Sequence, residues 1–174
     1  MHALDLGLSR HLFNFSLDLA HEHGVLFLLN ERLRTLPRFP GLRVSGLLDT
    51  LILEWPCKIA LQAFEYRELL RILCVVLVGL FPLEAEQLER ELIHCVQVYL
   101  NFYANLVSEE PHSTSSLDTL ETLAQNVASS WSTTLKDQSA SKLNFIKFHV
   151  IVHAASQLRR WGNHHVFSAE AGEG

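Results

Sequence analysis

Apolar residues recur along much of this chain at intervals of three and four, which is the period of an amphipathic helix. The first such run consists of Leu4, Leu8, Leu12, Phe15 and Leu19, and it predicts a helix over residues 3–19. The same spacing predicts further helices over 25–36, 58–80, 82–107, 117–135 and 142–161, with a short one over 47–55. The pattern therefore predicts an all-α fold of six or seven helices in one domain that covers residues 1–174.

The segment 58–80 is the strongest helical segment. Charged residues stripe its first half, and residues 72–78 are then apolar on every side. A helix that is apolar all round is typical of a buried position, so we expect the core to be centred on residues 69–80. The β-branched residues of this run would also fit a buried strand, but the flanking helical pattern favours a helix.

The last predicted helix has two different faces. Its buried stripe is expected to contain Phe148, Ile151, Val152, Ala155 and Leu158. Its polar face is expected to contain His149, His153, Ser156 and Arg160, which lie at i, i+4, i+7 and i+11. Arg159 and Arg160 fall in the last turn, where positive charge suits the helix dipole, and Gly162 is a natural stop.

Three polar segments separate or follow the predicted helices. Residues 36–46 form a loop rich in proline and glycine that is basic through Arg34, Arg38 and Arg43. We interpret it as a solvated connector, with a phosphate-contacting, nucleic-acid-binding loop as the alternative. Residues 108–116 form a second polar loop. In the tail, residues 162–174, Glu170 and Glu173 either face one site or belong to a frayed acidic end.

Other charged side chains are expected to be solvated. Glu31, Arg32 and Arg34 are placed on the wet side of their helix, and the four glutamates between residues 84 and 91 are placed on a solvated face. The triplet His21-Glu22-His23 lacks the spacing of a helical metal site, because neighbouring helix positions point apart.

Composition narrows the class of protein. The 174 residues carry a formal net charge of -5, which does not suit a self-sufficient nucleic-acid binder. The longest apolar run, residues 72–83, is too short to cross a bilayer, so no membrane association is expected. Cys57, Cys74 and Cys95 are widely spaced and odd in number, which indicates reduced thiols of an intracellular protein.

Three stretches, in order, resemble a known family. They are Met1-His2-Ala3-Leu4-Asp5-Leu6-Gly7-Leu8; Trp55 with Glu65-Tyr66-Arg67-Glu68-Leu69-Leu70 and Leu77-Val78-Gly79-Leu80; and Ile146-Lys147-Phe148-His149, His153, Gly162 and Ser168-Ala169-Glu170-Ala171-Gly172-Glu173. In this order they resemble the C-terminal half of large fungal cut-and-paste transposases of the CACTA-like group, the KDZ and Plavaka type. Such transposable-element proteins are DDE-type enzymes with an RNase H-like core, three acidic ligands for Mg²⁺ and a helical insertion before the last acid.

The resemblance implies that this chain is the helical insertion and the approach to the last acid. Glu170 or Glu173 would match that acid. His149 and His153 would match the family's two histidines, and together with Arg160 they would orient the segment that carries the acid without binding the metal themselves. The other two acids have no counterpart here, and Ile146 replaces the proline usual at that place. We therefore expect a truncated or decayed fragment that is inactive and binds no metal by itself, with DNA and the nucleus relevant only to a full-length transposase.

A second hypothesis does not depend on the resemblance. High apolar content without a complete catalytic site also fits a helical module that binds another protein or itself. Within either hypothesis, His149 and His153 share one helix face. They could chelate a transition metal or make structural hydrogen bonds in a packed helix, and the structural interpretation is favoured because no third ligand is fixed nearby.

Overall fold

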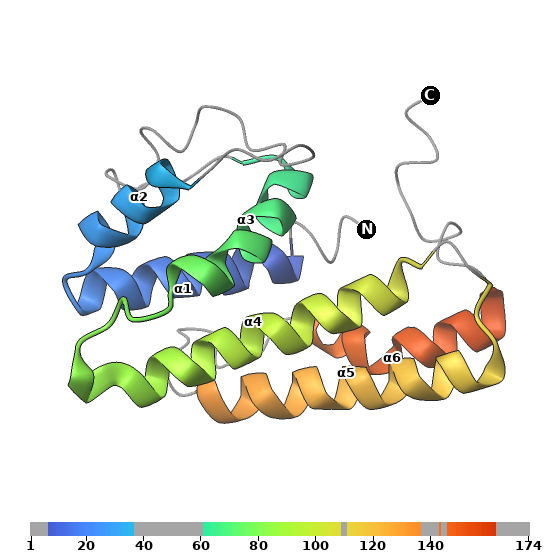
Figure 1. Ribbon diagram of the computed structural model, residues 1–174. Coiled ribbons are helices and arrows are strands. Elements are labelled where there is room, and N and C mark those ends of the chain that lie inside the picture. The colour runs from blue at the N-terminus through green and yellow to red at the C-terminus, as the bar shows by residue number, and fades with distance from the viewer. Residues whose placement is uncertain (1–6, 37–60, 109–110, 137–142, 144–145, 163–174) are drawn as a thin grey trace. The chain divides into compact units, whose positions relative to one another are not determined.

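The computed structural model describes residues 7–36, 61–108, 111–136, 143 and 146–162 (Figure 1). Within these residues the helices are α1 (Arg10–Glu22), α2 (Leu26–Thr35), α3 (Ala63–Val76), the short 3₁₀ helix η3 (Leu83–Ala85), α4 (Glu86–Leu106), α5 (Thr114–Thr134) and α6 (Ile146–Trp161). No strand occurs in this part of the chain, so the all-α prediction is confirmed. The helix predicted over 47–55, the loop over 37–46 and the tail beyond Gly162 lie outside the described residues.

The described chain forms two compact units that meet inside α4. We call the described residues up to Ile93 the N-terminal unit and those from His94 onward the C-terminal unit. The boundary falls within a continuous helix and not in a linker. The prediction of a single domain over 1–174 stays a prediction.

Leucine side chains form most of the interior of the N-terminal unit. The fully buried leucines of this unit are Leu8, Leu12, Leu17, Leu29, Leu69, Leu70, Leu73 and Leu77. One aromatic contact joins α1 to α3, where the rings of Phe13 and Tyr66 meet edge to face with their centroids 6.0 Å apart. Between α1 and α2 the chain turns at Gly24, whose φ of +68° lies in the left-handed region that favours glycine.

Helix α3 is shorter than predicted. It begins at Ala63, because the Glu65 carboxylate accepts a hydrogen bond from the Gln62 backbone N–H at 2.9 Å and so closes a capping box. It ends at Val76, and a turn containing Gly79 with φ +60° follows. Because residues 63–76 are helical, the alternative of a buried strand is wrong.

The expectation that residues 72–78 are buried on every side is also wrong. Ile72, Leu73, Val76 and Leu77 are buried, but Val75 is 64% exposed and Val78 is 62% exposed. Successive helical residues are rotated by about 100°, so Val75 lies about 200° from Leu73 and faces away from the core. The core therefore follows one face of α3 and continues into the turn.

Trp131 lies at the centre of the C-terminal unit. Its ring centroid is 5.5 Å from that of Tyr99 on α4 and 5.8 Å from that of Phe148 on α6. Its indole Nε1–H donates to the carbonyl oxygen of Cys95 at 3.3 Å. One side chain thus contacts both neighbouring helices, and Figure 1 shows α5 and α6 running side by side.

The inward stripe predicted for α5 is confirmed. All six of its members, Leu117, Leu120, Ala124, Val127, Trp131 and Leu135, are buried. The helix begins earlier than predicted, because the Ser113 hydroxyl accepts a hydrogen bond from the Ser116 backbone N–H at 3.1 Å. The polar loop before it is therefore shorter than 108–116.

The stripe predicted for α6 is confirmed except at Val152, which is 44% exposed. Ala154 is buried instead, which moves the middle of the buried arc away from Val152 by about 40°. The helix stops where predicted: Gly162 has φ +84°, and its N–H donates to the Leu158 carbonyl at 2.9 Å.

Candidate functional site

The predicted site residues divide into those that the structure describes and those that it does not. Glu170, Glu173, Arg38 and Arg43 lie outside the described residues, and their roles stay predictions. His149, His153 and Arg160 lie on α6, and Arg34 lies on α2.

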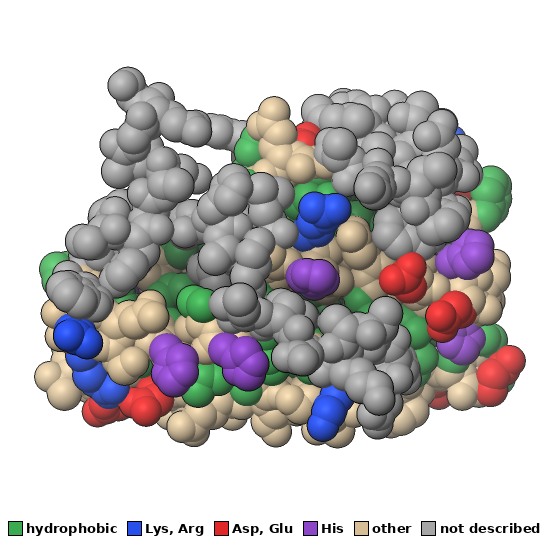
Figure 2. Space-filling view, turned by 180° about the vertical axis from the view of Figure 1, so that it is seen from behind, with side chains coloured by type: hydrophobic (Ala, Val, Ile, Leu, Met, Phe, Trp, Pro, Cys, Tyr) green, Lys and Arg blue, Asp and Glu red, His purple; other side chains and the backbone are tan. Residues whose placement is uncertain are grey.

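The polar face of α6 is exposed to solvent. His149, His153, Ser156 and Arg160 are all exposed, as their spacing predicts. The Ser156 hydroxyl donates to the backbone carbonyl of His153 at 2.8 Å and leaves the imidazole ring untouched. Figure 2 shows that histidine side chains reach the molecular surface on the face drawn there.

Arg159 on α6 makes ion pairs that the spacing of residues along the chain does not predict. Its guanidinium donates to the carboxylates of Asp118 and Glu121 on α5, the latter at 2.8 Å. Hydrogen bonds to Glu121 and then to Asp118 raise the pKa of Arg159 above its usual value. This residue therefore links the outer surfaces of α5 and α6 in addition to its favourable place near the helix C-terminus.

Arg34 is the one member of the predicted basic group that is described. It is exposed, and its guanidinium lies 3.3 Å from the Glu31 carboxylate one turn earlier in α2. Part of its charge is therefore offset within its own helix.

The turn after α3 is held by two charged side chains that the sequence analysis had assigned to solvent. The Arg32 guanidinium donates to the carbonyl oxygens of Val76 at 2.8 Å, Val78 at 2.6 Å and Gly79 at 2.8 Å. Carbonyl groups at a helix end lack partners within the helix, so Arg32 from α2 acts as a cap for α3. Arg32 is half-buried, so it lies on the wet side of α2 only in part, and the sequence pattern does not predict its contact with α3.

Glu89 completes the turn from the other side. Its carboxylate accepts hydrogen bonds from the backbone N–H groups of Gly79 at 2.7 Å and of Leu80 and Phe81 at 2.9 Å each. Glu89 is 6% exposed, so its placement on a solvated face is wrong. A buried carboxylate requires such donors, because an unpaired charge is costly in the interior.

Three large exposed apolar side chains lie in this turn or beside it in the sequence. Val75 precedes it, Val78 lies within it, and Leu83 follows it with 88% of its surface exposed. We call these three residues the turn surface. Two further exposed apolar residues, Phe27 and Leu28, begin the helix α2 that supplies Arg32.

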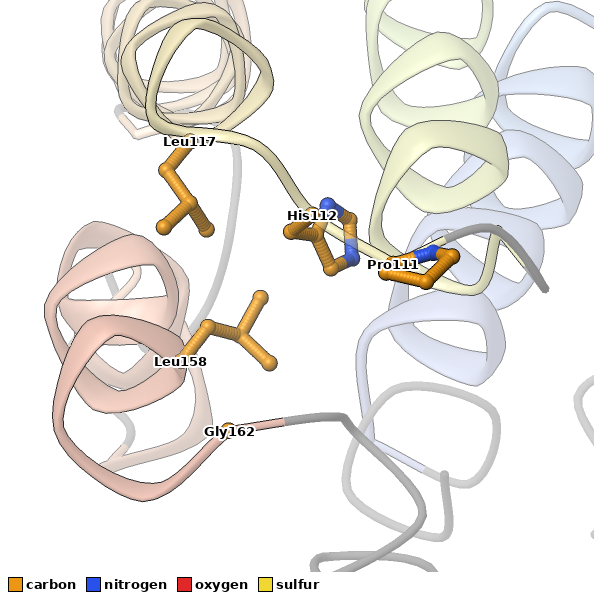
Figure 3. A pocket seen from close by; sticks show the side chains of 5 residues that line it. All are labelled: Pro111, His112, Leu117, Leu158 and Gly162. Atoms are coloured by element: carbon orange, nitrogen blue, oxygen red, sulfur yellow. The ribbon is translucent and has the colours of Figure 1, made fainter.

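A pocket of about 370 Å³ lies where the start of α5 meets the end of α6 (Figure 3). Its described lining consists of Pro111, His112, Leu117, Leu158 and Gly162. The Nε2 atom of His112 is buried and has no hydrogen-bond partner among the residues that the structure describes. The walls are otherwise apolar, so His112 is the one titratable group that this lining offers a ligand.

The cysteines that the structure describes are free thiols. Cys95 is buried, with its Sγ 3.2 Å from the Ser130 hydroxyl. Burial raises the pKa of the Cys74 thiol above its usual value, which disfavours the reactive thiolate. Cys57 lies outside the described residues.

Among the residues that the structure describes, no cluster of three or more His, Cys, Asp or Glu side chains could hold a metal ion. None of the helices found there is both long and apolar enough to span a bilayer.

Comparison of the chain with protein-family models, curated proteins and solved structures found no match. The resemblance to transposases therefore rests on its three motifs alone.

Proposed function

We propose that this chain is a helical interaction module that associates with a second copy of itself through the turn surface. The observation that carries the proposal is the exposure of Val75, Val78 and Leu83 within nine consecutive residues, 75–83. Single exposed apolar residues are ordinary, whereas a group of them on one segment is typical of an interaction site.

The backbone beneath the turn surface is fixed before any partner arrives. Arg32 and Glu89 together satisfy three carbonyl groups and three N–H groups of residues 76–81. A segment that is already ordered loses less conformational entropy on binding than a flexible one. This supports a role in recognition for the side chains that the turn presents.

The charges beside the turn surface favour a second copy as the partner. Arg71 lies one turn before Val75. Its guanidinium is 3.1 Å from the Glu68 carboxylate, and its side chain is still 59% exposed. Glu84 follows Leu83 directly and is exposed. In a two-fold dimer each copy offers the same patch in reverse, so the base of one copy can meet the acid of the other.

Sedimentation equilibrium over a wide range of protein concentrations tests the proposal. The wild-type chain should show a monomer–dimer equilibrium, and Val78→Asp combined with Leu83→Asp should abolish it, because buried carboxylates without partners oppose association. Val152→Asp is the matched control, since Val152 is an exposed apolar residue on α6. A wild-type chain that stays monomeric at every concentration, or a dimer that the turn-surface variant retains, would refute the proposal.

We also propose, from the order of the three motifs, that the chain derives from the helical insertion of a DDE-type transposase. In this proposal Glu170 or Glu173 corresponds to the last catalytic acid, and DNA binding by the chain alone is weak and salt-sensitive. Two metal ions in phosphoryl transfer need several converging carboxylates, so the isolated chain should neither cut nor join DNA with Mg²⁺ or Mn²⁺.

The genomic DNA that flanks the coding sequence tests this origin directly. In-frame acids and an RNase H-like strand pattern upstream would support it, and unrelated sequence on both sides would refute it. Metal-dependent DNA cleavage that is lost in Glu170→Ala or Glu173→Ala would instead show that the chain retains a working site.

A further inference from the structure

We infer that His149 and His153 form a binding site for one divalent transition-metal ion on the exposed face of α6. The inference is independent of both proposed functions, because it concerns neither the turn surface nor the acids of the tail. It rests on the spacing of the two imidazoles, on their exposure and on the charges around them.

The helix fixes the spacing of the pair. Residues at i and i+4 lie on one face, with their Cβ atoms about 5–6 Å apart. Both residues belong to the continuous helix Ile146–Trp161, so the backbone that carries them is already ordered. Two imidazoles one turn apart can direct ring nitrogens to the same ion, and imidazole suits Zn²⁺, Ni²⁺ and Cu²⁺.

Exposure of the rings changes the balance between the two interpretations of this pair. A structural role requires partners that accept or donate hydrogen bonds to the imidazoles. Both side chains are exposed, and within the described residues the hydrogen bond at His153 involves only its backbone carbonyl. The ring nitrogens are therefore accessible to an ion from solvent.

The two arginines at the end of α6, Arg159 and Arg160, should repel a bound metal ion only weakly. Arg159 is paired with Asp118 and Glu121 on α5, which offsets its charge. Arg160 lies seven residues beyond His153, about 10 Å along the helix axis at about 1.5 Å per residue. At that separation in solvent, its repulsion is strongly screened.

The chain supplies two ligands to such an ion. Zinc commonly takes four, so water or another external group would occupy the remaining positions. The ion at this site should therefore exchange with solvent, unlike a structural metal ion whose ligands all come from the protein. Binding should follow the general order for imidazole-rich sites, in which Cu²⁺ exceeds Ni²⁺.

Calorimetric titration of the full chain, free of any affinity tag, with Ni²⁺ and with Zn²⁺ tests the inference. The chain contains ten histidines, so the comparison between variants is decisive. His149→Gln combined with His153→Gln should weaken the tightest binding by at least about 10–100-fold, the loss seen even when an outer partner of a metal ligand is removed. The control is His21→Gln combined with His94→Gln, which removes two exposed imidazoles that lie on different helices, α1 and α4.

Thermal unfolding and pH give two further readouts. Because a metal that binds only the folded helix stabilises it, Ni²⁺ should raise the Tm of the wild type and of the control but not of the α6 variant. Metal binding should weaken as the pH falls, because only a neutral imidazole coordinates the ion. Glutamine is a good helix former, and circular dichroism verifies that each variant remains folded.

Addition of substoichiometric Co²⁺ to the wild type keeps the inference testable even if a variant misfolds. The ring proton signals of His149 and His153 should broaden before those of the other histidines. Equal loss of affinity in the control variant, unchanged affinity in the α6 variant, or earlier broadening at other histidines would each overturn the inference.

Discussion

The two units of this chain hold their helices together by different means. In the C-terminal unit, Trp131 contacts Tyr99 and Phe148 and so joins three helices through aromatic packing. In the N-terminal unit, the interior consists mainly of leucine side chains. Arg32 and Glu89 add hydrogen bonds from their charged groups to the backbone of one turn. Aromatic packing depends on shape, whereas the capped turn depends on a matched set of hydrogen bonds.

This difference shows where each unit is sensitive to change. A truncated aromatic side chain leaves a cavity whose cost grows with its volume. A lost charged cap leaves buried donors or acceptors without partners, and its cost depends on how many remain unsatisfied.

The largest effect is expected from Trp131→Ala. Removal of this fully buried indole should lower the free energy of unfolding by about 3–5 kcal/mol, as for other buried aromatic residues. Urea unfolding measures the loss, and amide hydrogen exchange should locate the weakened protection in α5 and α6 more than in α1–α3. A loss below about 1 kcal/mol would show that the C-terminal unit is not organised around this residue.

Much of this aromatic unit could be predicted from the sequence. The stripe of α5, which includes Trp131, follows directly from spacing of three and four, and all its members are buried. The error at Val152 arose because a helix face has an edge, and periodicity does not fix whether position 152 or 154 lies inside it. The stop at Gly162 was predictable because glycine readily adopts the positive φ that ends a helix.

The capped turn could not be predicted in the same way. Arg32 reaches carbonyl groups 44, 46 and 47 residues further along the chain, and local periodicity contains no information about such contacts. Glu89 resembles its exposed neighbour Glu86 in sequence, and only the fold makes one buried and the other solvated.

Leu73→Ala probes the leucine interior of the N-terminal unit. Leu73 is fully buried, so the substitution should cost about 2–5 kcal/mol, near or below the effect expected at Trp131. Val75→Ala on the opposite side of α3 is the matched control and should change stability by no more than about 0.5 kcal/mol, as for other surface positions. Equal losses at both positions in urea unfolding would contradict the assignment of the two faces.

Glu89→Gln probes the capped turn and should have an intermediate effect. The amide retains one acceptor oxygen but places an NH₂ group against backbone donors, so a loss of about 1–3 kcal/mol is expected. Hydrogen exchange should accelerate either at the amide of Gly79 or at those of Leu80 and Phe81, because the N–H groups that face the replaced oxygen lose their acceptor. Glu86→Gln, at an exposed glutamate paired with Arg90, should leave both stability and exchange close to the wild type.

The smallest effect is expected from Arg159→Ala, which tests whether burial explains the importance of charge in the N-terminal unit. Arg159 joins α5 to α6 through two carboxylates, yet all three side chains are exposed, and water and salt screen such pairs. Its raised pKa means that its stabilising contribution is complete below the usual pKa of arginine and is lost only as the pH rises through the raised value. The difference in the free energy of unfolding between variant and wild type should therefore be constant across the neutral pH range. It should disappear in about 1 M salt, where the Debye length is about 3 Å.

A double-mutant cycle with Asp118→Asn separates the ion pair from the loss of the apolar part of the arginine side chain. If that cycle gave a coupling as large as the loss at Glu89, charge alone and not burial would set the strength of these contacts.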